Sequence, residues 1–160
     1  MNTSDTITQI TNLFTQTSLC VDKLNQSLTT ELSCLKNSQA AQLLDNNAIK
    51  EQLMSELNVL DQQRKQLTSA YKIETREAYL QWLDTLDPTM TLKNKWLEIS
   101  DTIKQCQKQN ATNGIISEKM SQASVEVLNI VTGNSINPDS TYTATGAKPG
   151  TINSLHNTTA

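Results

Sequence analysis

The stretch Asn110-Ala-Thr-Asn-Gly-Ile-Ile116 combines the residues of a turn with the spacing of a helix. Asn113-Gly114 normally marks a tight turn or a helix end, because both residue types tolerate a positive φ. Apolar or small residues nevertheless continue on both sides in steps of three or four, which is the spacing of one helix face. We therefore predict a long, uninterrupted helix with a small, polar notch formed by Asn110, Asn113 and Gly114.

Two further long helices are predicted upstream of this one. Apolar residues in heptad-like steps between Ile7 and Leu35 predict the first, and Ser4 is expected to be its N-cap. Asn37-Ser38 predicts the turn that follows, and Ser38 is expected to cap a second helix ending near Tyr71. An antiparallel hairpin results.

In this hairpin, Glu31 and Lys50 are expected to face each other and form an ion pair. The apolar segment between Tyr71 and Leu86 predicts a short helix that covers one end of the bundle. Asp87-Pro88 is expected to start the last helix, because Asp suits an N-cap and Pro suits the first helical position.

The predicted fold is all-α: an antiparallel bundle of three long helices with one short additional helix. We expect the bundle domain to cover residues 1–131, with the last helix over 88–131. Residues 132–160 contain Gly and Pro among Asn, Ser and Thr and have no helical stripe, so we expect a flexible polar tail.

The composition gives little support for catalysis. His156 is the chain's one histidine, which rules out a two-histidine metal motif, and no P-loop or GxGxxG pattern occurs. Carboxylates such as Glu74 and Glu77 lie three residues apart, and we expect them on solvated helix surfaces. We expect no catalytic residues, no cofactor and no metal site.

The charge pattern and hydropathy narrow the class of partner. The net charge is −3, and no run of basic residues is present to neutralise a row of phosphates, so nucleic acid is not an expected ligand. No apolar run approaches the roughly 20 residues that cross a bilayer, and the first residues lack a positive segment. We expect a cytoplasmic protein with no stable membrane insertion. Cys20, Cys34 and Cys106 form no CxxC pair and are expected to be reduced.

After the notch, apolar residues cover more than one face of the predicted last helix. An apolar surface wider than the bundle requires can receive an amphipathic partner helix. The alternative is that these side chains all belong to the core. The residues in question are Ile115, Ile116, Met120, Val125, Val127, Leu128, Ile130 and Val131.

Several motifs together resemble the FlgN-type flagellar export chaperones. They are the pattern Asn110-x-x-Asn113-Gly114-x-Ile116, the apolar helical stretch after it, and a polar tail with Tyr142-x-x-x-Gly146. Leu28-x-x-Glu31, Lys50-x-x-Leu53-Met54 and Arg64 are similar to the family's amino-terminal half. The resemblance covers most of residues 4–150.

This resemblance implies a cytoplasmic chaperone that binds hook-associated, filament-junction proteins before their export. Its client site is expected on the last helix, with Gly114 allowing close approach and Asn113 bonding a client backbone. Asn110 and Asn113 have an alternative role inside the bundle, where they would hold its register. The expected client-binding residues are Asn110, Asn113, Gly114, Ile116, Met120, Ala123 and Val127.

The tail carries the second expected site. By similarity with the family, Tyr142 and Gly146 are expected to dock on the export-gate component of the flagellar secretion apparatus. The alternative for Tyr142 is an aromatic residue in a disordered tail with no binding role. The alternative function for the whole chain is a coiled-coil adaptor that self-associates through its first helix.

Overall fold

The computed structural model describes residues 3–71, 73 and 75–132, and the regular elements in these residues are helices. They are α1 (Thr3–Lys36), α2 (Ala40–Ser69), α3 (Arg76–Leu86) and α4 (Thr91–Val131). The chain has two structural units, Met1–Glu118 and Lys119–Ala160. The predicted all-α fold of three long helices and a short one is confirmed, and α4 passes through Asn113-Gly114 without a break.

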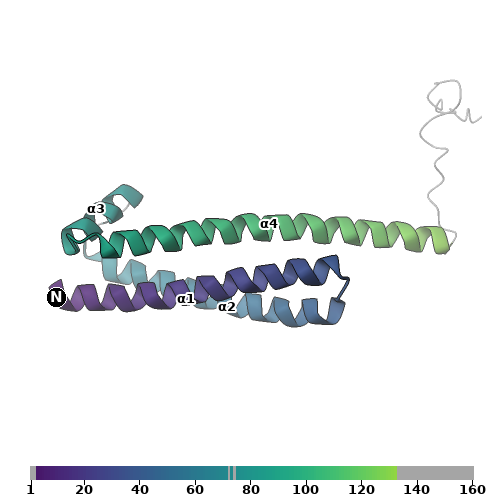
Figure 1. Cartoon of the computed structure of the whole chain (residues 1–160), viewed down its shortest axis with the longest axis horizontal. Helices are drawn as coiled ribbons and strands as arrows, with labels where there is room; N and C mark the ends of the chain where they lie inside the picture. Colours follow the sequence, from purple (N-terminus) through teal and green to yellow (C-terminus); the bar gives the residue numbers. More distant parts are fainter. Residues whose placement is uncertain (1–2, 72, 74, 133–160) are drawn as a thin grey trace, which may run out of the picture. The chain divides into compact units, whose positions relative to one another are not determined.

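In the first unit, α1 and α2 form an antiparallel hairpin, and the first part of α4 lies along it (Figure 1). α4 is parallel to α1, because Cys106 Sγ lies 3.9 Å from the Val21 carbonyl oxygen and Asn113 bonds the Leu28 carbonyl seven residues further along both helices. α1 therefore packs against both other long helices. It supplies more than half of the buried apolar residues: Ile10, Leu13, Phe14, Cys20, Val21, Leu24, Leu28, Cys34 and Leu35.

Aromatic side chains join α3 to the bundle. The Trp96 ring stacks on Phe14 with centroids 5.4 Å apart and meets the edge of Tyr79 at 5.1 Å. The Arg64 guanidinium lies 5.1 Å from the Tyr79 ring centroid and 5.2 Å from that of Trp96, within cation–π range. Burial raises the pKa of Tyr79 to about 12. This cluster binds the predicted short helix to α2 and α4.

Two predicted helix starts in the hairpin are wrong. α1 already includes Thr3, so Ser4 is a first-turn residue and not the N-cap. Ser38 has a φ of 55°, in the left-handed region, because the chain must reverse between α1 and α2 within three residues. The N-cap of α2 is Gln39, which makes no side-chain capping bond.

The start of α4 also differs from the prediction, since α4 begins at Thr91 and not at Pro88. Asp87 is the C-cap of α3, and its carboxylate accepts hydrogen bonds from the Thr89 and Leu92 backbone N–H groups at 3.1 and 3.0 Å. Hydrogen bonds from Thr89 and Leu92 lower the pKa of Asp87. Asp87 thus caps α4 from outside, across a turn in which Met90 has a φ of 61°.

The predicted ion pair between Glu31 and Lys50 is present. Glu31 is only 7% exposed although it carries a charge, so its carboxylate needs partners within the bundle. Cys20, Cys34 and Cys106 are buried and free, in agreement with the reduced state expected from their spacing.

Candidate functional site

The buried positions of α4 follow a strict seven-residue repeat that ends at the predicted notch. They are Leu92, Ile99, Cys106 and Asn113. The next two positions of this repeat are Met120, which is half-buried, and Val127, which is 58% exposed. The face of α4 that enters the bundle core therefore continues beyond Asn113 as an open surface.

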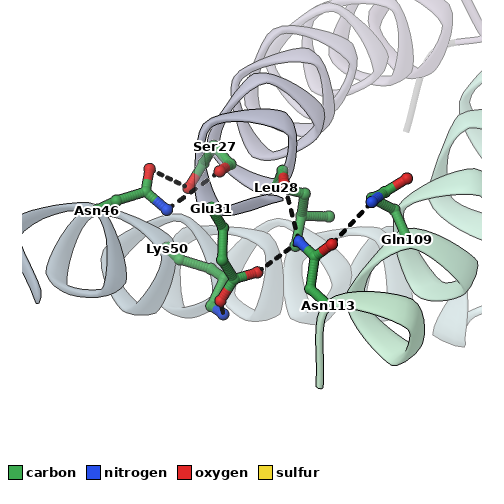
Figure 2. A network of polar contacts seen from close by, with 7 residues as sticks. All are labelled: Ser27, Leu28, Glu31, Asn46, Lys50, Gln109 and Asn113. Atoms are coloured by element: carbon green, nitrogen blue, oxygen red, sulfur yellow. Dashed lines mark hydrogen bonds and ion pairs between the residues drawn. The ribbon is translucent and has the colours of Figure 1, made fainter. Parts of the chain in front are cut away.

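Asn113 is the most deeply buried polar residue of α4, with 1% exposure, and it points into the bundle (Figure 2). Its amide nitrogen Nδ2 donates to the Leu28 carbonyl oxygen and to Glu31 Oε2, both at 2.8 Å. Its Oδ1 accepts a hydrogen bond from Gln109 Nε2 at 2.8 Å. These bonds satisfy the amide within the chain and match the internal role that the sequence left open for Asn113.

Glu31 connects all three long helices (Figure 2). Its Oε1 pairs with Lys50 of α2, while its Oε2 accepts the bond from Asn113 of α4. One turn earlier on α1, the Ser27 carbonyl accepts from Asn46 Nδ2, and the Ser27 hydroxyl donates to Asn46 Oδ1, both at 3.1 Å. We call Ser27, Glu31, Asn46, Lys50 and Asn113 the polar layer.

The predicted client-binding residues do not share one face of α4. At about 100° per residue, Gly114 lies about 160° around the helix from Ile116, and Asn110 lies about 120° from it. Asn110 and Gly114 are exposed, and a Cβ atom at Gly114 would have no heavy atom within 4 Å. The space expected beside Gly114 is therefore open, but the body of the helix separates it from the other predicted positions, Ile116, Met120, Ala123 and Val127.

The other four predicted residues do form one stripe, because they follow one another in steps of four, three and four. Ile116 and Met120 are half-buried, and Ala123 and Val127 are exposed. We call Ile116, Met120, Ala123 and Val127 the α4 stripe. Ile130 continues it with 66% exposure.

The rest of the second unit's helix is also apolar at its surface. Val125 and Leu128, on the Gly114 side of α4, are 54% and 60% exposed, and Val131 is 78% exposed. None of the described residues from 114 to 132 is fully buried. The apolar strip predicted for this segment thus lies at the surface of the described chain.

The first unit also contains a groove that was not predicted from the sequence. It has a volume of about 790 Å³ and lies between α2 and α4, with α1 as its floor. Met54 and Leu57 on α2 and Ile103 on α4 line it, and Asn110 lies in its wall. The spacing of apolar residues on α2 could have indicated this groove. The buried Leu53 and Leu60 are a full heptad apart, so the positions between them are not fully covered by the other helices.

Other kinds of site find no support in the described part of the chain. Within residues 3–71, 73 and 75–132, no three His, Cys, Asp or Glu side chains are grouped so that they could hold a metal ion. The described helices include none with the length and hydropathy needed to cross a membrane. Tyr142, Gly146 and His156 lie outside the described residues.

Comparison with known proteins places these features in a family. A family model described as "FlgN protein" matches residues 1–150, which is most of the chain. No curated protein and no solved structure matches. The matched range includes the polar layer, the α4 stripe and both predicted tail residues.

Proposed function

Because the chain belongs to the FlgN family, we propose that it binds the disordered carboxy-terminal segments of hook-associated proteins and delivers them to the export gate. FlgN proteins are a family of flagellar export chaperones, which bind flagellar substrate proteins and are generally not enzymes. The identity of the client, the delivery step and the cytoplasmic location are parts of the proposal. The observation that carries it is the exposed apolar surface of α4 after Asn113.

We place the client contact on the α4 stripe. Ile116 at one end of the stripe is half-buried, and Val127 near the other end is 58% exposed. A partner helix would therefore cover apolar side-chain area that is now in water. Met120 is at the centre of the stripe, and its flexible thioether adapts to irregular partner surfaces. Ala123 lets a partner backbone approach closely.

The remaining predicted residues receive different tasks in this proposal. Asn113 stays inside the bundle, because both polar ends of its amide already have partners there. Asn110 lies in the wall of the groove between α2 and α4, and Gly114 lies on the other side of the helix from the α4 stripe. Both would touch a client only if it used a second surface.

A disordered client suits such a surface. Its segment would fold as a helix against the α4 stripe, and the entropy lost on folding would keep the affinity moderate. Moderate affinity permits release of the client at the export gate. The binding step itself needs no nucleotide. The client's own apolar face would meanwhile be kept from premature association.

The tail supplies the second contact in this proposal. We assign docking on the export-gate component to Tyr142 and Gly146, by similarity with the family's tail motif. The family match, which extends to residue 150, supports this assignment because it includes both residues. The bundle, residues 1–131, would then bind the client, and the tail, residues 132–160, would dock the complex on the export-gate component.

The alternative of an adaptor that self-associates through α1 has less support. Three of the apolar residues in heptad-like steps on α1 are each 1% exposed, because α2 and α4 cover them: Phe14, Val21 and Leu28. A dimer formed through this face of α1 would first have to displace the chain's own helices. We therefore retain the chaperone as the proposed function.

Calorimetric titration of the full chain with the carboxy-terminal segment of a hook-associated protein tests this function. Met120→Asp places a charge in the α4 stripe, and we expect it to weaken binding by about tenfold or more. Met54→Asp is the matched control, since it makes the same change at a 49% exposed methionine in the groove of the first unit. Equal losses in both variants would move the client site to the groove or to both surfaces. If the unmodified chain binds the carboxy-terminal segment of no hook-associated protein, the proposed client class is wrong.

A further inference from the structure

Two helices of the first unit carry the same buried pattern with one asparagine each. On α2 the heptad positions Asn46, Leu53 and Leu60 are buried. On α4 they are Leu92, Ile99, Cys106 and Asn113. Along each helix, the apolar members could replace one another after a slip of seven residues with little chemical change. The asparagines could not, because their amides need polar partners.

Both asparagines bond α1 within four residues of each other. Asn46 bonds Ser27, and Asn113 bonds the Leu28 carbonyl and the Glu31 carboxylate. Glu31 carries the negative charge of this polar layer and is 7% exposed. Buried polar groups of this kind stabilise a bundle less than apolar residues of similar size, but they specify the register of its helices.

We infer that the polar layer, through the bond between Asn113 and Glu31, fixes the register of α4 on α1, so that Asn113 and not Met120 lies opposite Glu31. A slip of one heptad would move α4 by about 10 Å along α1. Asn113 would then take the place of Cys106, and its amide would face Leu24 where it now faces Glu31. Met120 would face Glu31, and Glu31 Oε2 would lose its donor.

The two asparagines should differ in importance. α2 follows α1 after only residues 37–39, so the short turn already fixes the register of the hairpin. α4 is separated from α2 by residues 70–90, which include α3, and this longer connection allows more freedom. The loss of Asn113 should therefore affect register, whereas the loss of Asn46 should affect mainly stability.

The consequence for client binding rests on the proposed function. Met120 is the next heptad position after Asn113, so a slip in that direction would draw the centre of the α4 stripe into the bundle. Asn113 and Glu31 are positioning residues in this account, since they act on the client surface through the placement of α4. The register itself can be measured without any client.

The chain's single phenylalanine provides a clean reporter of register. Phe14 stacks on Trp96, and a heptad slip would put Ile103 in the place of Trp96. In full-length protein with labelled phenylalanine, we expect one set of Phe14 signals with a nuclear Overhauser contact to Trp96. Asn113→Leu should lose this contact or add a second set of signals, while Asn46→Leu, the matched control, should keep the single set.

A second variant covers the case in which Asn113→Leu does not fold. Asn113→Leu alone leaves Glu31 Oε2 without its donor. Asn113→Leu combined with Glu31→Leu removes both members of that bond, and Lys50, whose side chain is 22% exposed, can turn to water, so the double variant should fold. Loss of the Phe14–Trp96 contact in the double variant supports the inference. A single, unchanged contact in whichever of these variants folds would overturn it, whatever the result of the client titration.

Discussion

Gly114 and Ile116 lie on opposite sides of α4, although both belong to the motif that pointed to a binding site. Two residues along a helix correspond to about 200° of rotation, which leaves the two positions about 160° apart. Gly114 is exposed, and no heavy atom lies within 4 Å of a Cβ placed there. A partner helix on the α4 stripe would therefore not touch Gly114, and the two positions can be tested separately.

Gly114→Leu should stabilise the protein and leave client binding nearly unchanged. Leucine is about 0.8 kcal/mol more favourable than glycine inside an exposed helix, so the free energy of unfolding should rise by up to about that amount. Urea unfolding followed by circular dichroism measures this change, and calorimetry measures the affinity. A drop in affinity of tenfold or more would return Gly114 to the client site and would indicate that the client approaches the side of α4 with Val125 and Leu128.

Cys20 should react slowly with alkylating reagents in the folded protein. Its thiol is 2% exposed and contacts the Leu53 carbonyl oxygen, and burial, together with the negative charge of Glu56, raises its pKa to about 11. Against the ordinary value of 9.0, the thiolate fraction at pH 8 should be roughly 100-fold lower. Iodoacetamide labelling followed by peptide mass spectrometry measures this reactivity, with the urea-unfolded chain as the reference.

The same pKa predicts how stability changes with pH. Above pH 9 the unfolded Cys20 loses its proton, while the folded thiol keeps it until about pH 11, so Cys20 should lower the free energy of unfolding across this interval and not below it. Cys20→Ser should remove this contribution. Glu56→Gln should reduce it, because the Glu56 charge and hydrogen bond both favour the protonated thiol. Labelling of folded Cys20 as fast as in urea would contradict the raised pKa.

Periodicity predicted the helices well because each long helix buries a regular stripe. The spacing on either side of Asn113-Gly114 outweighed the local turn signal, and the Glu31–Lys50 pair followed from the hairpin geometry. The helix starts were harder to predict. Ser38 and Met90 adopt a positive φ without being glycine, and Asp87 caps α4 from five residues before Leu92. Such turn geometry depends on where the flanking helices pack, which local residue preferences do not contain.

The candidate site was only partly predictable for a related reason. Asn110 and Asn113 are three residues apart, so both fit a helical stripe, but only Asn113 is buried. The distinction comes from the strict heptad that begins at Leu92, whereas a looser series of three and four residue steps admits both. The exposure of the α4 stripe depends in turn on which face of α4 packs against α1, and that choice is made by contacts distant in sequence.

Deletion of residues 135–160 should separate client capture from delivery. The α4 stripe lies wholly before residue 132, so the shortened chain should bind a hook-associated segment within about twofold of the full chain by calorimetry. Binding to the isolated export-gate component should be lost, and Tyr142→Ala in the full chain should weaken it in the same direction, because an aromatic ring contributes much of the contact area in a short docking motif. Tyr71→Ala, which changes a 43% exposed tyrosine after α2, is the control for a general effect of losing an aromatic side chain. If the deletion abolishes client binding and spares the export gate, the two sites are reversed, and the apolar surface of α4 faces the gate.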